Sequence, residues 1–136
     1  MSMKSKFKSN TSLVNDGVWF DVDKNSDGSL CRVKLRRTGQ GNALWSAAWR
    51  KHNDQNLEDL TPEQDREFMA KVYADAVVAG WENMQPNDDG KAWDFSHDNV
   101  VKLLQDPDWL DFRAWLRERA DSLAPFQDAR EEEAKN

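Results

Sequence analysis

Two runs of alternating apolar and polar residues, joined by a turn sequence, constrain the fold of this chain most strongly. Apolar side chains alternate with polar ones over residues 18–22 and again over residues 31–35. Asp27-Gly28 lies between the two runs, and this dipeptide is typical of hairpin turns. We therefore predict a β-hairpin over residues 17–37. A two-stranded hairpin is marginal in water, so its apolar face must pack on helices or on a partner.

The second face of this hairpin is basic. It would carry Trp19 beside a stripe formed by Arg32, Lys34 and Arg36. Residues 1–51 hold 10 Lys and Arg against 4 Asp and Glu, whereas residues 52–136 hold 9 against 21. This charge division suggests self-association between the basic and acidic parts, or two differently charged partners. Two solvated surfaces of opposite sign explain it equally well.

Helix signals dominate the chain after the hairpin. Thr61-Pro62-Glu63-Gln64 combines a capping box with a proline in the first turn, and apolar residues keep helical spacing from there to Trp81. Further helix starts are expected at Asn42, Ser96 and Asp106-Pro107. The predicted fold is mainly α with a minor β part: an N-terminal hairpin followed by about four to five helices in one small bundle-like domain.

The predicted domain organisation has three parts. Residues 1–16 form a flexible basic arm, and residues 131–136 form an acidic disordered tail. Between them, residues 17–130 form a single domain, in which residues 42–130 are the helical part. The first ten residues lack the apolar segment of a signal peptide, and no apolar run has the length of a membrane span. With a single cysteine, Cys31, the chain is expected to be cytosolic.

Several sequences resemble catalytic or metal-binding motifs without completing them. Residues 23–28 match the start of a calcium-binding loop, but Lys34 stands where a bidentate Glu is needed. Ser96-His97-Asp98 cannot form a triad from adjacent residues, and Cys31 fits a small apolar residue better than a nucleophile. His52 and His97 are too few for most zinc sites. We therefore expect no enzyme activity, no cofactor and no metal.

Seven tryptophans make protein binding the favoured class of function, because indole rings are enriched at binding hot spots. Most of them are expected to be core residues, with one or two facing a partner. The candidate protein-binding residues are Trp19, Arg32, Lys34, Arg36, Trp45, Trp49, Trp81 and Trp115.

An ordered series of short motifs carries a family resemblance. The motifs are Gly17-Val18-Trp19, Leu35-Arg36-Arg37-Thr38-Gly39, Gly80-Trp81-Glu82-Asn83, Asp89-Gly90 before Phe95-Ser96, and Asp106-Pro107. In this order, over about residues 17–136, the chain resembles the tail assembly chaperones of long-tailed (siphovirus-type) bacteriophages. The extra tryptophans and Pro125 depart from that family's pattern.

The resemblance implies a chaperone that binds and solubilises the tape measure protein, recruits tail tube (major tail protein) subunits, and leaves the finished virion. It also implies action in the cytoplasm of the bacterial host. The helical faces with Trp45, Trp49, Trp81 and Trp115 would bind the tape measure protein or neighbouring copies. The outer face of the hairpin would bind a second partner, such as the acidic part of the next copy. Such genes often make a longer product by ribosomal frameshifting, and the ending Lys135-Asn136 is compatible with a slippery codon pair.

A second class of function stays open. The basic hairpin could instead serve a phage- or prophage-encoded nucleic-acid-binding or regulatory protein, with Trp19 stacking on a base. We favour the chaperone, because the acidic residues 52–136 repel a polyanion.

Overall fold

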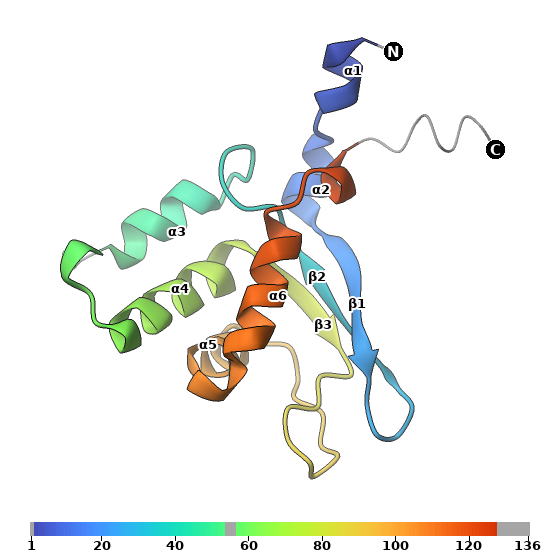
Figure 1. Cartoon of the computed structure of the whole chain (residues 1–136), viewed down its shortest axis with the longest axis vertical. Coiled ribbons are helices and arrows are strands. Elements are labelled where there is room, and N and C mark those ends of the chain that lie inside the picture. The colour runs from blue at the N-terminus through green and yellow to red at the C-terminus, as the bar shows by residue number, and fades with distance from the viewer. Residues whose placement is uncertain (1, 54–56, 128–136) are drawn as a thin grey trace.

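The computed structural model describes residues 2–53 and 57–127, which form a three-stranded antiparallel sheet and several helices (Figure 1). The strands lie in the order β1-β2-β3, with bounds β1 (Val18–Lys24), β2 (Leu30–Leu35) and β3 (Val78–Glu82). The helices are α1 (Met3–Phe7), α2 (Thr11–Asp16), α3 (Trp45–His52), α4 (Pro62–Ala76), α5 (His97–Gln105) and α6 (Leu110–Ala120). Single 3₁₀ turns occur at Leu57–Asp59, Pro107–Trp109 and Ala124–Phe126.

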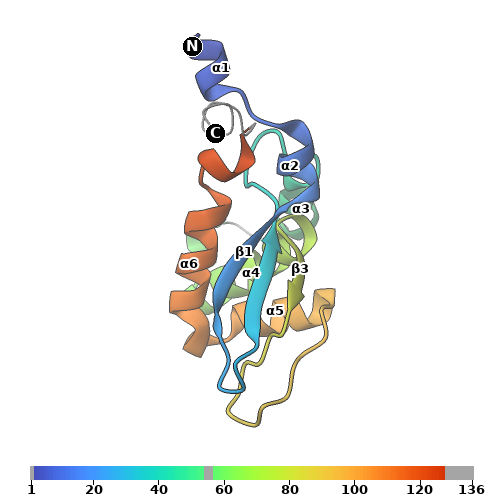
Figure 2. The same ribbon diagram turned by 90° about the vertical axis from the view of Figure 1, so that its right-hand side faces the viewer.

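The described helices α4, α5 and α6 lie on one face of the sheet, and the opposite face is uncovered (Figure 2). Alternate residues of β2 point into the resulting core, where Cys31, Val33 and Leu35 are buried. Helix α4 supplies the facing layer with Val72 and Ala76, neither of which has measurable exposure. None of the described helices is both long and apolar enough to span a membrane.

The predicted fold class is wrong, because the protein is an α+β structure with a three-stranded sheet and not a hairpin attached to a helical bundle. The difference lies at residues 78–82. The helix predicted to run to Trp81 ends at Ala76, and the chain returns along β2 as β3. Two consecutive β-branched residues, Val77 and Val78, favour this change from helix to strand.

A β-bulge explains why this strand has helical spacing in the sequence. Leu35 pairs with Val78 and Lys34 pairs with Gly80, so that Ala79 is an extra residue in β3. The bulge turns Val78 and Trp81, three residues apart, towards the same buried side. A period of three is the spacing that a helix would give, and the sequence pattern could not separate the two.

The predicted hairpin is confirmed in the pairing of β1 with β2. Asp27 organises its turn: one carboxylate oxygen accepts hydrogen bonds from the Ser29 backbone N–H at 2.9 Å and the Ser29 hydroxyl at 2.6 Å. The other oxygen accepts from Gln85 at 2.9 Å. These bonds, led by Ser29, lower the pKa of Asp27 to about 2. The carboxylate that resembled a calcium ligand therefore stabilises the turn.

The segment predicted as a flexible arm differs from that expectation at residues 11–16. These residues form α2, whose start is capped by the Asn10 side chain, and Val14 is 2% exposed. The Asn10 N–H donates to the Phe126 carbonyl at 2.9 Å, and Phe126 is fully buried. One buried valine and these backbone bonds are enough to order a segment whose composition looked unstructured. The predicted tail, residues 131–136, lies outside the described residues.

The helix starts at Thr61 and Ser96 are confirmed, each with its side chain accepting from a backbone N–H three residues later. Asn42 has a larger role than the predicted cap. Its amide nitrogen donates to the carbonyls of Arg37 and Ala76, both at 2.8 Å, and its amide oxygen accepts from the Leu44 N–H at 2.9 Å. It is 6% exposed, so it joins the end of β2, the end of α4 and the start of α3 inside the protein.

We predict that Asn42→Ala lowers the free energy of unfolding by about 2 to 3 kcal/mol, because two carbonyls lose a donor and one is buried. Urea unfolding followed by tryptophan fluorescence measures the change. Asn87→Ala, at an exposed loop position, is the matched control and should stay within about 0.5 kcal/mol of the natural protein. Equal stabilities for the two variants would contradict this role for Asn42.

Candidate functional site

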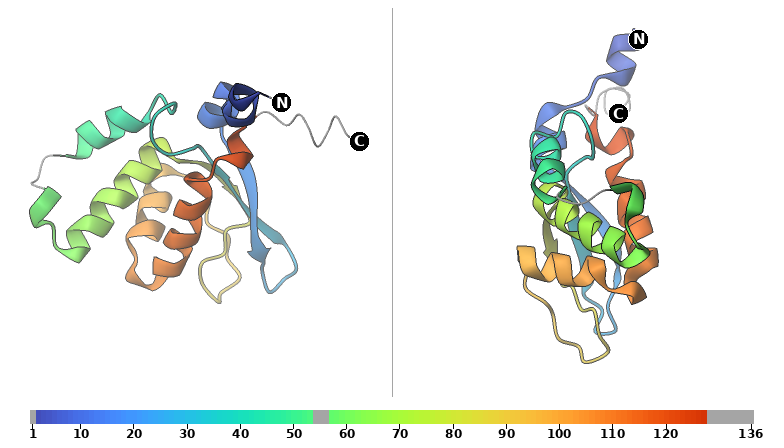
Figure 3. Two further views of the ribbon diagram at one scale, coloured as in Figure 1. Left: turned by 45° about the horizontal axis from the view of Figure 1, so that its top comes forward. Right: turned by 90° about the vertical axis from the view of Figure 1, so that its left-hand side faces the viewer.

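A groove of about 690 Å³ lies between α3, α4 and α6. The right-hand view of Figure 3 shows these three helices from the side away from the sheet. Helix α4 lies between the other two, with Met69, Ala70 and Tyr73 on the groove. Helix α3 adds Trp45 and Trp49. Helix α6 adds Leu110, Arg113, Ala114, Leu116, Arg117 and Glu118. The remaining lining residues are Asp65 of α4, Leu104 of α5, and Thr38, Gly39 and Asp121 between elements.

The α3 side of the groove is aromatic. Trp45 and Trp49 lie four residues apart, on the same side of the helix, with ring centroids 5.9 Å apart. Trp45 meets Tyr73 edge-on at 6.2 Å, and Trp49 meets Phe68 at 4.9 Å. Both indoles are only partly buried, so they pack on α4 and also offer surface to an occupant of the groove.

The α6 side mixes apolar and basic groups. Leu110, Arg113, Ala114 and Arg117 follow the spacing of one helix face. Leu110 is 49% exposed and Ala114 is also exposed, so apolar surface is open to solvent here. Burial lowers the pKa of Tyr73's neighbour Arg113, and the same cause raises the pKa of Tyr73 to about 12. Tyr73 is buried and Arg113 is partly buried, so both polar groups are largely or partly withdrawn from water.

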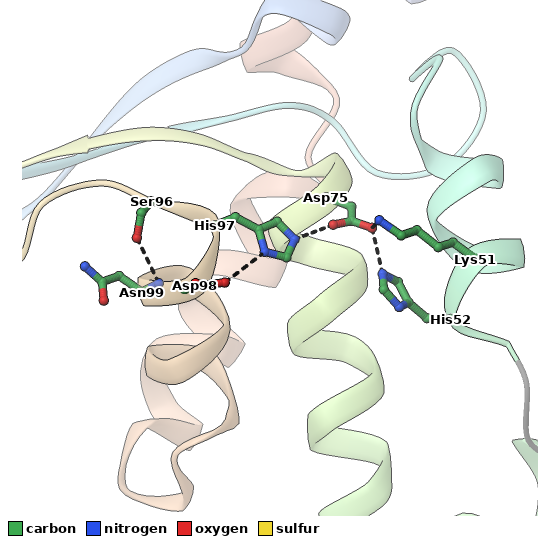
Figure 4. Close-up of polar contacts among 7 residues, drawn as sticks. All are labelled: Lys51, His52, Asp75, Ser96, His97, Asp98 and Asn99. Carbon is green, nitrogen blue, oxygen red and sulfur yellow. Dashed lines mark hydrogen bonds and ion pairs between the residues drawn. The ribbon is translucent and has the colours of Figure 1, made fainter.

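A polar cluster holds the aromatic side in place (Figure 4). Asp75 on α4 binds His52 of α3 through one carboxylate oxygen, at 2.6 Å, and His97 of α5 through the other. Lys51 approaches the same carboxylate at 3.8 Å. His52 is the last residue of α3, so this contact fixes the end of the helix that carries both groove tryptophans. One carboxylate thus connects three helices.

This cluster has the elements of acid–base chemistry but no nucleophile. Ser96 lies next to His97 in sequence, yet its hydroxyl caps α5 by accepting from the Asn99 N–H. Burial alone would raise the pKa of Asp75, but the hydrogen bonds from His97 and His52 outweigh burial and lower it. Among the described residues, no group of His, Cys, Asp or Glu has the arrangement of a metal site. We therefore assign the cluster to the positioning of α3.

The outer face of the sheet brings together three of the candidate residues. Trp19 pairs with Lys34 across the strands, and the Arg32 guanidinium lies 4.9 Å from the centre of the Trp19 ring. Arg32 is also 3.2 Å from Asp21 and 3.7 Å from Glu82, so acidic groups share this face. Arg36 is not part of it, since its Nε donates to the Asn15 carbonyl at 2.8 Å. The basic stripe is thus shorter and more neutralised than the sequence suggested.

Trp81 and Trp115 lie elsewhere. Trp81 is 8% exposed and its indole N–H donates to the Trp93 carbonyl at 2.8 Å, so it belongs to the core. Trp115 stacks on Phe112 with ring centroids 5.8 Å apart, and the Arg119 guanidinium lies 4.0 Å from its ring centre. Neither residue lines the groove.

The sequence interpretation missed the α6 side of the groove and the polar cluster. The spacing of Leu110, Arg113, Ala114 and Arg117 marks one helix face, and this signal was available in the sequence. No local signal connects His52, Asp75 and His97, because they are more than twenty residues apart and meet only through the packing of three helices.

We predict that Asp75→Asn lowers the free energy of unfolding at pH 7 by about 1 to 2 kcal/mol, because the amide lacks the charge that both histidines bind. The lowered pKa of Asp75 stabilises the folded state above the ordinary carboxyl pKa, near 3.8. The free energies of unfolding of the two proteins should therefore converge as the pH falls below 3.8 towards the lowered pKa of Asp75. Urea unfolding between pH 7 and pH 3 tests this, with Asp88→Asn on an exposed loop as the control. A difference that persists unchanged in acid would contradict it.

The region that matches a known protein family includes most of the residues that line the groove. The model of the YdaY prophage protein family matches residues 40–136, which include α3, α4, β3, α5 and α6. The groove residues lie in this range except for Thr38 and Gly39, whereas β1 and β2 precede it. Searches of curated proteins and of solved structures gave no match. The phage origin expected from the sequence is thus confirmed, and the chain belongs to the YdaY prophage protein family.

Proposed function

We propose that this prophage protein is a tail assembly chaperone whose groove between α3, α4 and α6 binds the tape measure protein. It then recruits tail tube subunits in the host cytoplasm and does not enter the mature virion. No catalytic step, cofactor or metal is part of this proposal. The observation that carries it is the groove itself, with Trp45 and Trp49 facing the exposed Leu110 across α4.

The shape and lining of the groove favour a protein segment as its occupant. A volume of about 690 Å³ accommodates several large side chains. An amphipathic helix presents such side chains three and four residues apart, which suits a groove bounded by helices. Tape measure proteins are long helical proteins with extensive apolar surface, so a covering protein would prevent their aggregation.

The charge of the chain supports the same function. The formal net charge is −6, and all of the acidic excess lies in residues 52–136, outside the hairpin, since residues 1–51 carry a basic excess. Copies bound along an apolar rod would give that rod a negative surface, and like charges keep such assemblies soluble.

The outer face of the sheet is the proposed second surface. Trp19, Arg32 and Lys34 are adjacent there, and within the described residues no helix covers them. We propose that this face contacts a neighbouring copy or a tail tube subunit. Asp21 and Glu82 on the same face disfavour the alternative partner, nucleic acid.

Co-expression with the tape measure protein of the same prophage tests the groove. We predict that Ala114→Trp, which places a ring in the groove from an exposed helix position, lowers the yield of soluble tape measure protein at least tenfold. Ala47→Trp, exposed on α3 but outside the groove, is the matched control and should preserve that yield. Circular dichroism confirms that both variants fold.

Two results would count against the proposal. Equal solubilisation by the natural protein and Ala114→Trp would remove the groove as the binding surface. Tape measure protein that is equally insoluble with and without the natural protein would remove the chaperone function.

A further inference from the structure

Three buried donors without an acceptor lie in and next to the groove. In the described part of the chain, the buried side-chain polar atoms that lack a hydrogen-bond partner are Trp49 Nε1, Arg66 Nε and Arg113 Nη1. All three are N–H donors, and none is an acceptor. Trp49 and Arg113 line the groove. An unsatisfied buried donor is costly, and two of these three belong to arginines that also carry a charge.

The two arginines lack the neutralisation that the neighbouring arginine has. Arg117 lies 3.8 Å from Asp121, and Asp121 also accepts from the Thr38 hydroxyl. Within the described residues, neither Arg66 nor Arg113 has a carboxylate within 4.0 Å, although Asp65 also lies in the groove. Glu118 is engaged by Arg119 at 4.0 Å.

The electrostatic environment of Arg113 also indicates that its positive charge lacks a full counter-charge. Burial lowers its pKa most strongly, Asp65 raises it in part, and the charges of Arg66 and Arg117 lower it again. A guanidinium stays protonated in proteins, so the charge of Arg113 is only partly compensated by its surroundings. An anion placed between α4 and α6 would offset it.

We propose that the groove recognises an acidic side chain within an apolar helical segment of the partner protein. The carboxylate accepts hydrogen bonds from the Arg113 guanidinium, and the nearby charge of Arg66 adds to its attraction. An adjacent apolar side chain packs on Trp49 and Met69. This proposal rests on the function proposed above and names the chemistry of its partner. A planar carboxylate matches a guanidinium in two-point geometry, which a neutral carbonyl does not.

The apolar and acidic requirements together define a short recognition pattern. Side chains three or four residues apart lie on one face of a helix, so a Glu or Asp at that distance from a Leu, Phe or Met would meet both parts of the groove. The long-range repulsion from the acidic chain opposes such a ligand and is screened by salt, whereas a desolvated pair between carboxylate and arginine is screened much less.

A displayed library of helical peptides tests the proposal with the full chain. We expect the natural protein to enrich peptides with Glu or Asp three or four residues from a large apolar residue. For one such peptide, replacing Glu by Gln should weaken binding about tenfold, which corresponds to one charged hydrogen-bonded contact. Against Arg113→Gln, the Glu and Gln peptides should bind equally. Arg50→Gln, exposed on α3 and outside the groove, is the matched control and should retain the preference for Glu.

The outcomes separate this inference from the proposed function. Enriched peptides that are apolar without an acidic preference, or a Glu preference that survives Arg113→Gln, would overturn the inference and leave the groove as a binding site. If Ala114→Trp blocked none of the enriched peptides, both the inference and the groove would be overturned. Arg113→Lys keeps the charge but loses the two-point geometry, so an intermediate preference is expected.

Discussion

Burial of the inner sheet face against α4 is the constraint on which the rest of the structure depends. A hairpin alone has too little apolar contact to be stable in water, and β3 with α4 supplies what is missing. These two elements are consecutive in the chain, separated by Val77, which is fully buried. The turn from α4 into β3 therefore positions the third strand beside β2 and the covering helix over the sheet together.

The position of the groove follows from this packing. One side of α4 faces the sheet and the opposite side faces outward, where α3 and α6 flank it (Figure 3). Two sets of hydrogen bonds fix the position of α3 on α4: those of Asn42 before the start of α3 and those of Asp75 at the end of α3. Trp45 and Trp49, which lie between these two sets of hydrogen bonds, are held in place without being fully buried. A prearranged surface of this kind loses less conformational entropy on binding than a mobile one does.

The parts of the fold that could be predicted from the sequence depend on local chemistry. The Asp27-Gly28 turn, the capping box at Thr61 and the cap at Ser96 each act within a few residues, and each is present in the structure. The failure at Trp81 has a specific cause, since the bulge at Ala79 gave a strand the spacing of a helix. The helix α2 was not expected from the sequence, because its packing depends on a single buried side chain, Val14, in a polar segment.

The candidate site was only half predictable for similar reasons. Trp45 and Trp49 were recognisable as binding residues because an indole is distinctive in any sequence. Trp81 was grouped with them but packs in the core. Arg36 was expected on the outer face of the hairpin, and its Nε donates to the backbone of α2. Arg66 and Arg113 lie near enough for the charge of one to act on the other, but they belong to two helices separated by a strand and another helix, and no sequence spacing reveals their proximity.

The indole N–H signals of the seven tryptophans provide the most direct measurement of where a partner binds. They are recorded by ¹⁵N NMR before and after addition of the tape measure protein, and assigned with single Trp→Phe variants. We predict that the Trp45 and Trp49 signals shift or broaden, while the signal of Trp81, which is buried in the core, keeps its unbound position. Changes confined to Trp19, with Trp45 and Trp49 unaffected, would contradict it and move the binding surface to the sheet.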